Sequence, residues 1–471
     1  MAPARKRATR WSVHLSSAPP IGGARGKHRK QRVRYVGMDI HKEIAVSCII
    51  DEKGTVLQRQ RCSCTREALE QFSRGYLQAT DQVAVEATTN TWAVVEILKP
   101  FVAEVVVSNP LKTKAIAEAK IKTDQVDAEV LAQLLRCDFL PRVWEPPVAT
   151  QVLRRGTARR AALVMDKTAI KNRLHAVLHQ RLIPCPFTDL FGVQGRHWLQ
   201  TLSLDTDGRA SVDSDLRLLA SLEAEIAQQE QELATAAYEE PRVKLLMTLP
   251  GVSLTVAQTL WAVLGEVERF RDADHAASYF GLVPSTHQSG KRCYHGPITK
   301  HGHRQARALL VQAAHHVRIH PGPLGAFFRR VAKRRGYNVA VVATARKLVV
   351  IAWHMLKTNE PYRYAQPQTV EYKLEQLRVM ATGEKRKRGY AKGTPRPATY
   401  GSGQRVERIR SLGQVCERSA LPSPKGLASL PLAEQRMLEQ SGTLEFAQAI
   451  QHDKLKIRKV KKEGTCCELP S

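Results

Sequence analysis

The sequence lacks any apolar run close to the roughly 20 residues that a membrane-spanning helix needs, so we expect no membrane span. The basic N-terminal stretch that ends at Arg10 is not followed by the apolar segment of a signal peptide, so we do not expect secretion. The nine cysteines are scattered, and the close pairs Cys62/Cys64 and Cys466/Cys467 lack the spacing of a zinc site. They are typical of reduced thiols in a cytosolic protein.

Acidic residues are scarce relative to basic ones. The chain has 44 Asp and Glu against 73 Lys and Arg, which gives a formal net charge of +29. An excess of this size favours a polyanionic partner, because each phosphate that is neutralised releases counterions. Hydrophobic residues make up 43% of the 471 residues, enough to bury a core in two or three domains. We therefore expect a folded protein that binds nucleic acid.

The chain divides into five segments by composition and periodicity. Strand and helix patterns alternate in the second segment, strand patterns vanish in the third, and Pro, Gly and Ser accumulate in the last. The first segment has ten Lys or Arg and no acid. The predicted segments are a disordered basic arm (1–34), a mixed α/β domain (35–149), a helical linker (150–242), a mainly helical domain (243–364) and a basic, largely disordered tail with one possible helix at 432–451 (365–471).

The linker carries two predicted helices. Leu153–Leu182 has an apolar stripe and a basic face, and a later stretch has apolar residues spaced alternately by three and four. That spacing is typical of a coiled-coil seam, which a dimer or a hairpin folded back within one chain would both use. The basic face comprises Arg154, Arg155, Arg159, Arg160, Lys167, Lys171 and Arg173, and the seam comprises Leu219, Leu222, Ile226, Gln229 and Leu233.

Four carboxylates occupy unusual places in the α/β domain. Asp39 stands inside an apolar strand, where an unpaired charge is costly, and Glu86 ends the next buried strand. Asp124 and Asp127 are three residues apart on a predicted helix and share one face. Singly, each could be a helix cap or a surface charge. Together they predict a divalent-cation site, in which two Mg²⁺ ions would activate a nucleophile and stabilise the leaving oxygen of a phosphodiester.

The second domain contains a tight turn between two apolar helical stretches. Pro250 and Gly251 make the turn, and the backbone amides of Gly251 and Val252 could hold a phosphate oxygen in the manner of a helix-hairpin-helix module. An ordinary helix–helix turn would have the same residues.

Three ordered motifs of the α/β domain resemble a known family. The segments Gly37–Lys42, Glu86–Thr88 and Lys122–Ala128 resemble the DEDD insertion-sequence transposases, the insertion-sequence family numbered one hundred and ten, which includes the pilin-gene DNA invertases. The resemblance covers about 35–145 and 243–364. It implies an RNase H-like first domain, similar to the Holliday-junction resolvase. At Thr89-Asn90 this chain lacks the glycine that the family pattern leads us to expect, which bears on the local turn.

The family resemblance extends to a motif of the second domain, Ser289-Gly290-Lys291. It implies that Ser289 is a nucleophile that forms a covalent phosphoserine with DNA, and Ser285 is a less favoured alternative. A serine hydroxyl needs activation by a base or a metal. The residues expected to hold phosphate oxygens nearby are Lys291, Lys300, Arg304 and Arg307.

The expected function is DNA strand breakage and rejoining during transposition. The resemblance implies a structured guide RNA, and because the acids and the serine lie on separate domains, we expect a homo-oligomer, dimer or tetramer, with a shared site. We expect a cytoplasmic, nucleoid-associated protein of a bacterium or archaeon. The alternatives are a site-specific DNA invertase, a junction-resolving nuclease that uses water, and a non-catalytic nucleic-acid-binding protein.

Overall fold

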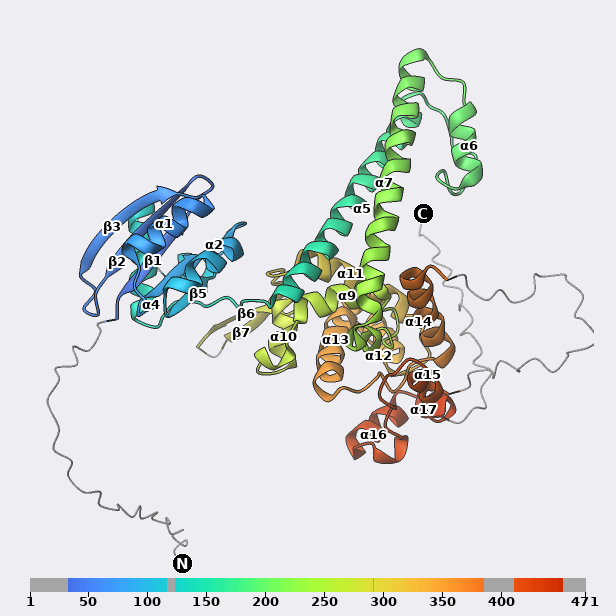
Figure 1. Cartoon of the computed structure of the whole chain (residues 1–471). Coiled ribbons are helices and arrows are strands. Elements are labelled where there is room, and N and C mark those ends of the chain that lie inside the picture. Colours follow the sequence, from blue (N-terminus) through green and yellow to red (C-terminus); the bar gives the residue numbers. More distant parts are fainter. Residues whose placement is uncertain (1–32, 117–122, 291, 385–410, 452–471) are drawn as a thin grey trace, which may run out of the picture. The chain divides into compact units, whose positions relative to one another are not determined.

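The computed structural model describes residues 33–116, 123–290, 292–384 and 411–451. The chain forms two compact units, Met1–Glu145 and Pro146–Ser471 (Figure 1). Most of the predicted basic arm, up to residue 32, lies outside the described residues.

The first unit is a five-stranded mixed sheet with helices on both faces (Figure 1). The sheet order is β3-β2-β1-β4-β5, in which β2 is antiparallel to both neighbours and β1, β4 and β5 run parallel. Its elements are β1 (Tyr35–Ile40), β2 (Ile44–Ile50), β3 (Val56–Ser63), α1 (Arg66–Tyr76), β4 (Gln82–Glu86), α2 (Thr91–Leu98), η1 (Lys99–Phe101), β5 (Glu104–Ser108), α3 (Pro110–Ile116) and α4 (Asp124–Arg136).

Alternation along the strands gives the sheet two buried faces. Val36 and Met38 of β1 pack with α1 and α2 on one face, whereas Ala84 of β4 packs against α4 on the other. The apolar run 35–50 is not one continuous strand, because the exposed residues 41–43 divide it into β1 and β2. The predicted mixed α/β architecture is confirmed.

The second unit is mainly helical, with one two-stranded sheet. Its elements are α5 (Val148–Gln180), α6 (Val193–Thr201), α7 (Thr206–Tyr238), α8 (Pro241–Leu246), α9 (Leu254–Leu264), η2 (Val267–Arg269), α10 (Ala273–Tyr279), β6 (Pro284–Ser289), β7 (Arg292–Ile298), α11 (Arg304–Val317), α12 (Pro323–Arg335), α13 (Tyr337–Thr358), α14 (Pro367–Thr382), α15 (Leu412–Arg418), η3 (Leu427–Ser429), α16 (Leu432–Gln440) and α17 (Leu444–Gln451).

The long helices α5 and α7 pack side by side as a hairpin within the chain (Figure 1). The seam residue Leu219 of α7 is buried with Leu174 and Leu178 of α5. Of the two arrangements that the seam allowed, the single chain therefore contains the hairpin, and a coiled-coil dimer stays a prediction. The basic face of α5 is paired with α7 in antiparallel order, through Arg160–Glu230, Lys167–Glu223 and Arg173–Asp215.

The predicted disordered tail is wrong over much of its length. In α14, Val370, Leu374 and Leu377 recur at helical spacing and are buried in the core of the second unit. Helices α15, α16 and α17 also contribute buried residues to this core, whereas 385–410 and 452–471 lie outside the described residues. The polar composition of the tail led to the prediction of disorder, because only one face of each helix is apolar.

Among the described residues, one helix, α13, is long and apolar enough to cross a membrane by length and composition alone. Arg346 and Lys347 interrupt its apolar sequence, so no uninterrupted apolar run in it reaches 20 residues. It packs against α10, α11 and α12, and its Trp353 is buried with Nε1 donating to Val267 O at 3.1 Å. The apolar residues of α13 thus contribute to the core of the second unit.

Candidate functional site

Asp39 and Glu86 come to the same edge and the same face of the sheet. Strands β1 and β4 are parallel, and Met38 lies opposite Val85, so that Asp39 and Glu86 follow at the ends of neighbouring strands. Since Met38 and Val85 point into the core beneath α1 and α2, the next residue of each strand points to the face that α4 covers.

Helix α4 brings the other two acids to this face. The side chain of Thr123 caps the helix by accepting from the amide of Val126 at 3.3 Å. Asp124 and Asp127 lie in the first turn, where the helix dipole favours negative charge. The four predicted carboxylates thus come from two strand ends and one helix end.

Gly37 allows α4 to lie close against β1. A Cβ atom at this position would stand 1.9 Å from Ala128 O and 2.6 Å from Ala132 N, far inside van der Waals contact. Any side chain at Gly37 would therefore push α4 away from the strand that carries Asp39. The sequence contained a signal for this role, because a glycine inside a β-branched strand often marks a close backbone approach.

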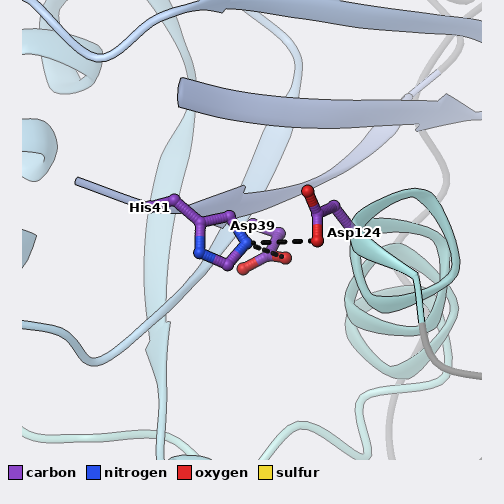
Figure 2. A group of neighbouring side chains, drawn as sticks. All are labelled: Asp39, His41 and Asp124. Carbon is purple, nitrogen blue, oxygen red and sulfur yellow. Dashed lines mark hydrogen bonds and ion pairs between the residues drawn. The ribbon is translucent and has the colours of Figure 1, made fainter. Parts of the chain in front are cut away.

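Three side chains converge at this edge, as Figure 2 shows: Asp39, His41 and Asp124. His41 Nε2 lies 3.1 Å from Asp39 Oδ2 and 3.3 Å from Asp124 Oδ1. The three potential ligand atoms are all within 4.8 Å of one another. The side chain of Asp39 is 11% exposed, against 53% for His41 and 56% for Asp124, so the cluster is buried on one side and open on the other.

Burial raises the pKa of Asp39 above its usual value, and the neighbouring charges of Asp127 and Asp124 raise it further, while His41 opposes the shift. This arrangement of like charges around a partly desolvated carboxylate is one that a divalent cation relieves. Asp127 therefore acts on Asp39 electrostatically, and half-buried Glu86 ends the adjacent strand. His41 was not predicted as part of the cluster, although it lies in the Gly37–Lys42 motif.

Ser289 lies in the second unit, at the end of β6 beside the turn of a β-hairpin. The register places it opposite Arg292, and both residues are exposed. Gly290 occupies the turn with φ +57°, a conformation that glycine adopts without strain. Lys291, a predicted phosphate ligand, lies outside the described residues. Arg292 was not predicted, yet its position suits a phosphate contact beside the serine hydroxyl.

Ser285 has different surroundings from Ser289. It is half-buried, and its Oγ lies only 2.4 Å from where a Cβ atom on Gly296 would stand, so the hydroxyl faces the opposite strand. Ser289 is the more accessible of the two hydroxyls.

Comparison with known proteins matches two stretches of the chain, one in each unit. Residues 36–183 match the sequence model of a DEDD-type transposase domain, and residues 243–328 match that of the transposase family IS116/IS110/IS902. The chain belongs to this family. A DEDD transposase domain implies an RNase H-like fold, and the mixed sheet of the first unit agrees with it. Membership implies an enzyme that cuts and rejoins DNA.

For three relatives of this transposase, the match to this chain covers more than nine tenths of the relative's own length. The transposase for insertion sequence element IS1111A of Coxiella burnetii is 25% identical over 344 residues, which cover 70% of this chain and 92% of the relative. The pilin gene-inverting protein of Moraxella lacunata is 25% identical over 350 residues, covering 70% and 97%. The transposase for IS1328 of Yersinia enterocolitica is 24% identical over 335 residues, covering 68% and 96%.

The remaining predicted phosphate ligands of the transposase have unequal surroundings. Lys300 and Arg304 are exposed, and Lys300 has a left-handed φ of +56° in the loop before α11. Arg307 is half-buried and donates from Nη1 to Phe280 O at 3.0 Å, and burial lowers its pKa. Lys300 and Arg304 are thus accessible to a phosphate in solution, whereas Arg307 also stabilises the fold through its hydrogen bond to Phe280 O.

The turn at Pro250 joins α8 and α9 and is closely packed. Gly251 has φ +77°, and a Cβ there would lie 2.4 Å from Ala313 O of α11. Val252 is buried, and its amide donates to Leu249 O at 3.3 Å. The predicted phosphate contact of Gly251 and Val252 therefore stays a prediction, and for Val252 it would have to replace this bond.

Proposed function

We propose that this transposase cuts and rejoins DNA with Mg²⁺ ions held by Asp39, Glu86, Asp124 and Asp127 and with Ser289 as the nucleophile. The observation that carries the proposal is the convergence of Asp39 and Asp124 around one point at the edge of the sheet.

The donor set suits a hard divalent cation. Carboxylate oxygens are the protein ligands that Mg²⁺ prefers, and they come here from rigid elements, two parallel strands and the first turn of α4. The raised pKa of Asp39 reflects a charge that its protein surroundings compensate only in part. When bound, the metal would activate the attacking oxygen and stabilise the leaving oxygen. The two strands and the first turn of α4 hold the carboxylate ligands in fixed positions.

Ser289 supplies a hydroxyl at the accessible end of a hairpin. Attack of Oγ on phosphorus would form a phosphoserine bond and break one phosphorus–oxygen bond of the backbone, and the serine proton would pass to the departing deoxyribose oxygen. The reverse attack by a strand-end hydroxyl would rejoin DNA without external energy, because the phosphodiester energy is kept. Arg292, across the turn from Ser289, would bind a phosphate oxygen.

The proposal includes partners. Since the acids and the serine belong to different units, we propose a homo-oligomer, dimer or tetramer, in which one catalytic site combines residues of two protomers. We also propose that a structured guide RNA selects the DNA sites. The net charge of +29 supports binding of both nucleic acids.

A second candidate is site-specific DNA inversion by the same chemistry. It is favoured by the relative named as a pilin gene-inverting protein, which matches this chain over as large a share as the transposase of IS1111A does. Sequencing the DNA on both sides of the gene separates the two functions, because a mobile element has its own ends and an invertible segment has paired crossover sites.

The decisive experiment traps the covalent intermediate. Wild-type protein stopped in denaturant during reaction with labelled DNA should carry the label on a peptide that contains Ser289. Ser289→Ala should lose the label and recombination, Asp39→Asn should lose both while still binding DNA, and Ser285→Ala should keep both. Recombination by Ser289→Ala would show that the serine is not the nucleophile and favour hydrolysis by water. Normal Mg²⁺-dependent cleavage by Asp39→Asn would exclude the metal site.

A further inference from the structure

The β6–β7 hairpin presents two faces with different side chains. Cross-strand pairs share a face, and the register pairs Ser289 with Arg292 and His287 with Tyr294. Because residues two apart on a strand also share a face, all four side chains lie on one side of the hairpin. Gln288 and its partner Cys293 point to the other side.

His287 and Tyr294 are stacked on this face. Their ring centroids are 5.0 Å apart with an angle of 16° between the ring planes. Tyr294 is 64% exposed, which leaves a large aromatic surface in water. Another His–Tyr pair of the second unit, His315 and Tyr337, is also stacked, with ring centroids 5.5 Å apart and 28° between the ring planes. That pair has further contacts, because His315 Nδ1 and the Tyr337 hydroxyl share a hydrogen bond of 2.7 Å and Tyr337 packs edge-on against Phe328.

The charge of this part of the chain selects the kind of ligand. Between residues 275 and 359 the sequence contains no Asp or Glu but 14 Lys and Arg. The hairpin lies within this stretch, and the exposed Arg292 stands one row from the aromatic pair. An anionic ligand with flat, stackable groups fits such a surface, and a single-stranded nucleic acid has both properties.

We propose that His287 and Tyr294 form a stacking platform for an unpaired base of the DNA strand whose phosphate lies at Ser289. The inference rests on the proposed function of Ser289. One strand repeat of two residues separates the two rows, roughly 7 Å, so a base flanking the reacting phosphate would reach the rings. Holding that base unstacked from its duplex would fix the position of the phosphate against the hydroxyl.

The test uses the full chain with Ser289→Ala as background, so that it does not depend on the serine's chemistry. The probe is a short single-stranded DNA with one 2-aminopurine, whose fluorescence falls on stacking, and binding is compared with that of the matched duplex. Tyr294→Ala should weaken single-strand binding roughly 5- to 150-fold and abolish the quenching. Tyr294→Phe should keep both, and Gln288→Ala, exposed on the opposite face, should behave like the background.

A photo-crosslinking measurement locates the contact directly. A single 5-iododeoxyuridine in the same strand should crosslink to the peptide that contains Tyr294, and this product should disappear in Tyr294→Ala. Unchanged single-strand affinity together with crosslinks elsewhere would overturn the platform, whatever the fate of the covalent label at Ser289. Quenching and crosslinking with single-stranded RNA but not DNA would overturn the assignment to the DNA strand.

Discussion

The role of Gly37 makes a sharp prediction about the carboxylate site. In Gly37→Ala, the new Cβ would stand 1.9 Å from Ala128 O, and ordinary contact begins near 3.4 Å, so α4 must move by about 1.5 Å. The atom that clashes is backbone, which cannot rotate away as a flexible side chain would. Overpacking of this kind costs about 1–3 kcal/mol, a large fraction of the stability of an ordinary domain.

The same displacement should weaken the metal site. Asp124 moves with α4 whereas Asp39 stays on β1, so the donor atoms that now lie within 4.8 Å separate. Changes that disturb ligand positions without removing a ligand cost roughly 10- to 100-fold in metal affinity. We expect a loss of this size for Mn²⁺, used as a spectroscopic substitute for Mg²⁺ and measured by electron paramagnetic resonance.

Urea denaturation and Mn²⁺ titration of the full chain measure the two effects. Gly75→Ala is a suitable control, because it lies in α1 where a new Cβ meets nothing within 4 Å, and it should stabilise the helix by about 0.5–1 kcal/mol. If Gly37→Ala matches wild type in both stability and Mn²⁺ affinity, α4 is not held against β1 as described and the geometric account of the site is refuted.

Four further predictions follow from individual residues. Asp39→Asn should leave the metal-free melting temperature equal or higher at neutral pH. The reason is that a carboxyl group with a raised pKa stabilises the fold only at low pH and loses that contribution as pH rises through its pKa. A clearly lower melting temperature would contradict this prediction. Burial lowers the pKa of His320 from 6.5 to about 4, so the free energy of unfolding should fall by up to about 3 kcal/mol as pH decreases through that interval. His320→Asn keeps an acceptor for the Gly322 amide and should flatten the plot of unfolding free energy against pH. Lys373→Met should destabilise the second unit by about 2–4 kcal/mol, measured by urea denaturation. The carbonyls of Met247, Leu249 and Val252 would lose the ammonium donor that they share. The control Lys347→Met, at an exposed position, should have little effect. Deleting residues 1–34, with ten Lys and Arg, should weaken DNA binding at low salt and flatten the slope of log K against log salt; an unchanged slope would place the arm away from nucleic acid.

Much of the first unit was predictable because its signals are local. Three local signals are an apolar, β-branched run before Ile50, a helix-capping threonine at Thr65 and a short apolar run that ends at Glu86. The structure has β2, α1 and β4 at these places. The boundary inside 35–50 is hard to predict from sequence, because a turn of only three polar residues barely interrupts the apolar pattern.

The candidate site was predictable in residue type and incomplete in geometry. An acid in a buried strand is costly wherever it occurs, so Asp39 and Glu86 could be singled out without coordinates. His41 joins the cluster only because β1 ends where α4 begins its first turn, 83 residues later in the chain. Periodicity carries no information about such a contact, and the same limit hid the packing role of Gly37.

Charge was the property that sequence described least well. The basic residues of α5 contribute to the net charge from which we predicted a nucleic-acid partner, but several of them pair with acids of α7 some 40 to 70 residues away. The sequence alone was enough to recognise the family and to predict the acids and the serine, since those predictions depend on residue identity and spacing. Tertiary structure decided which charges are already neutralised and which side chains meet, because both depend on distances between segments that the chain brings together only by folding.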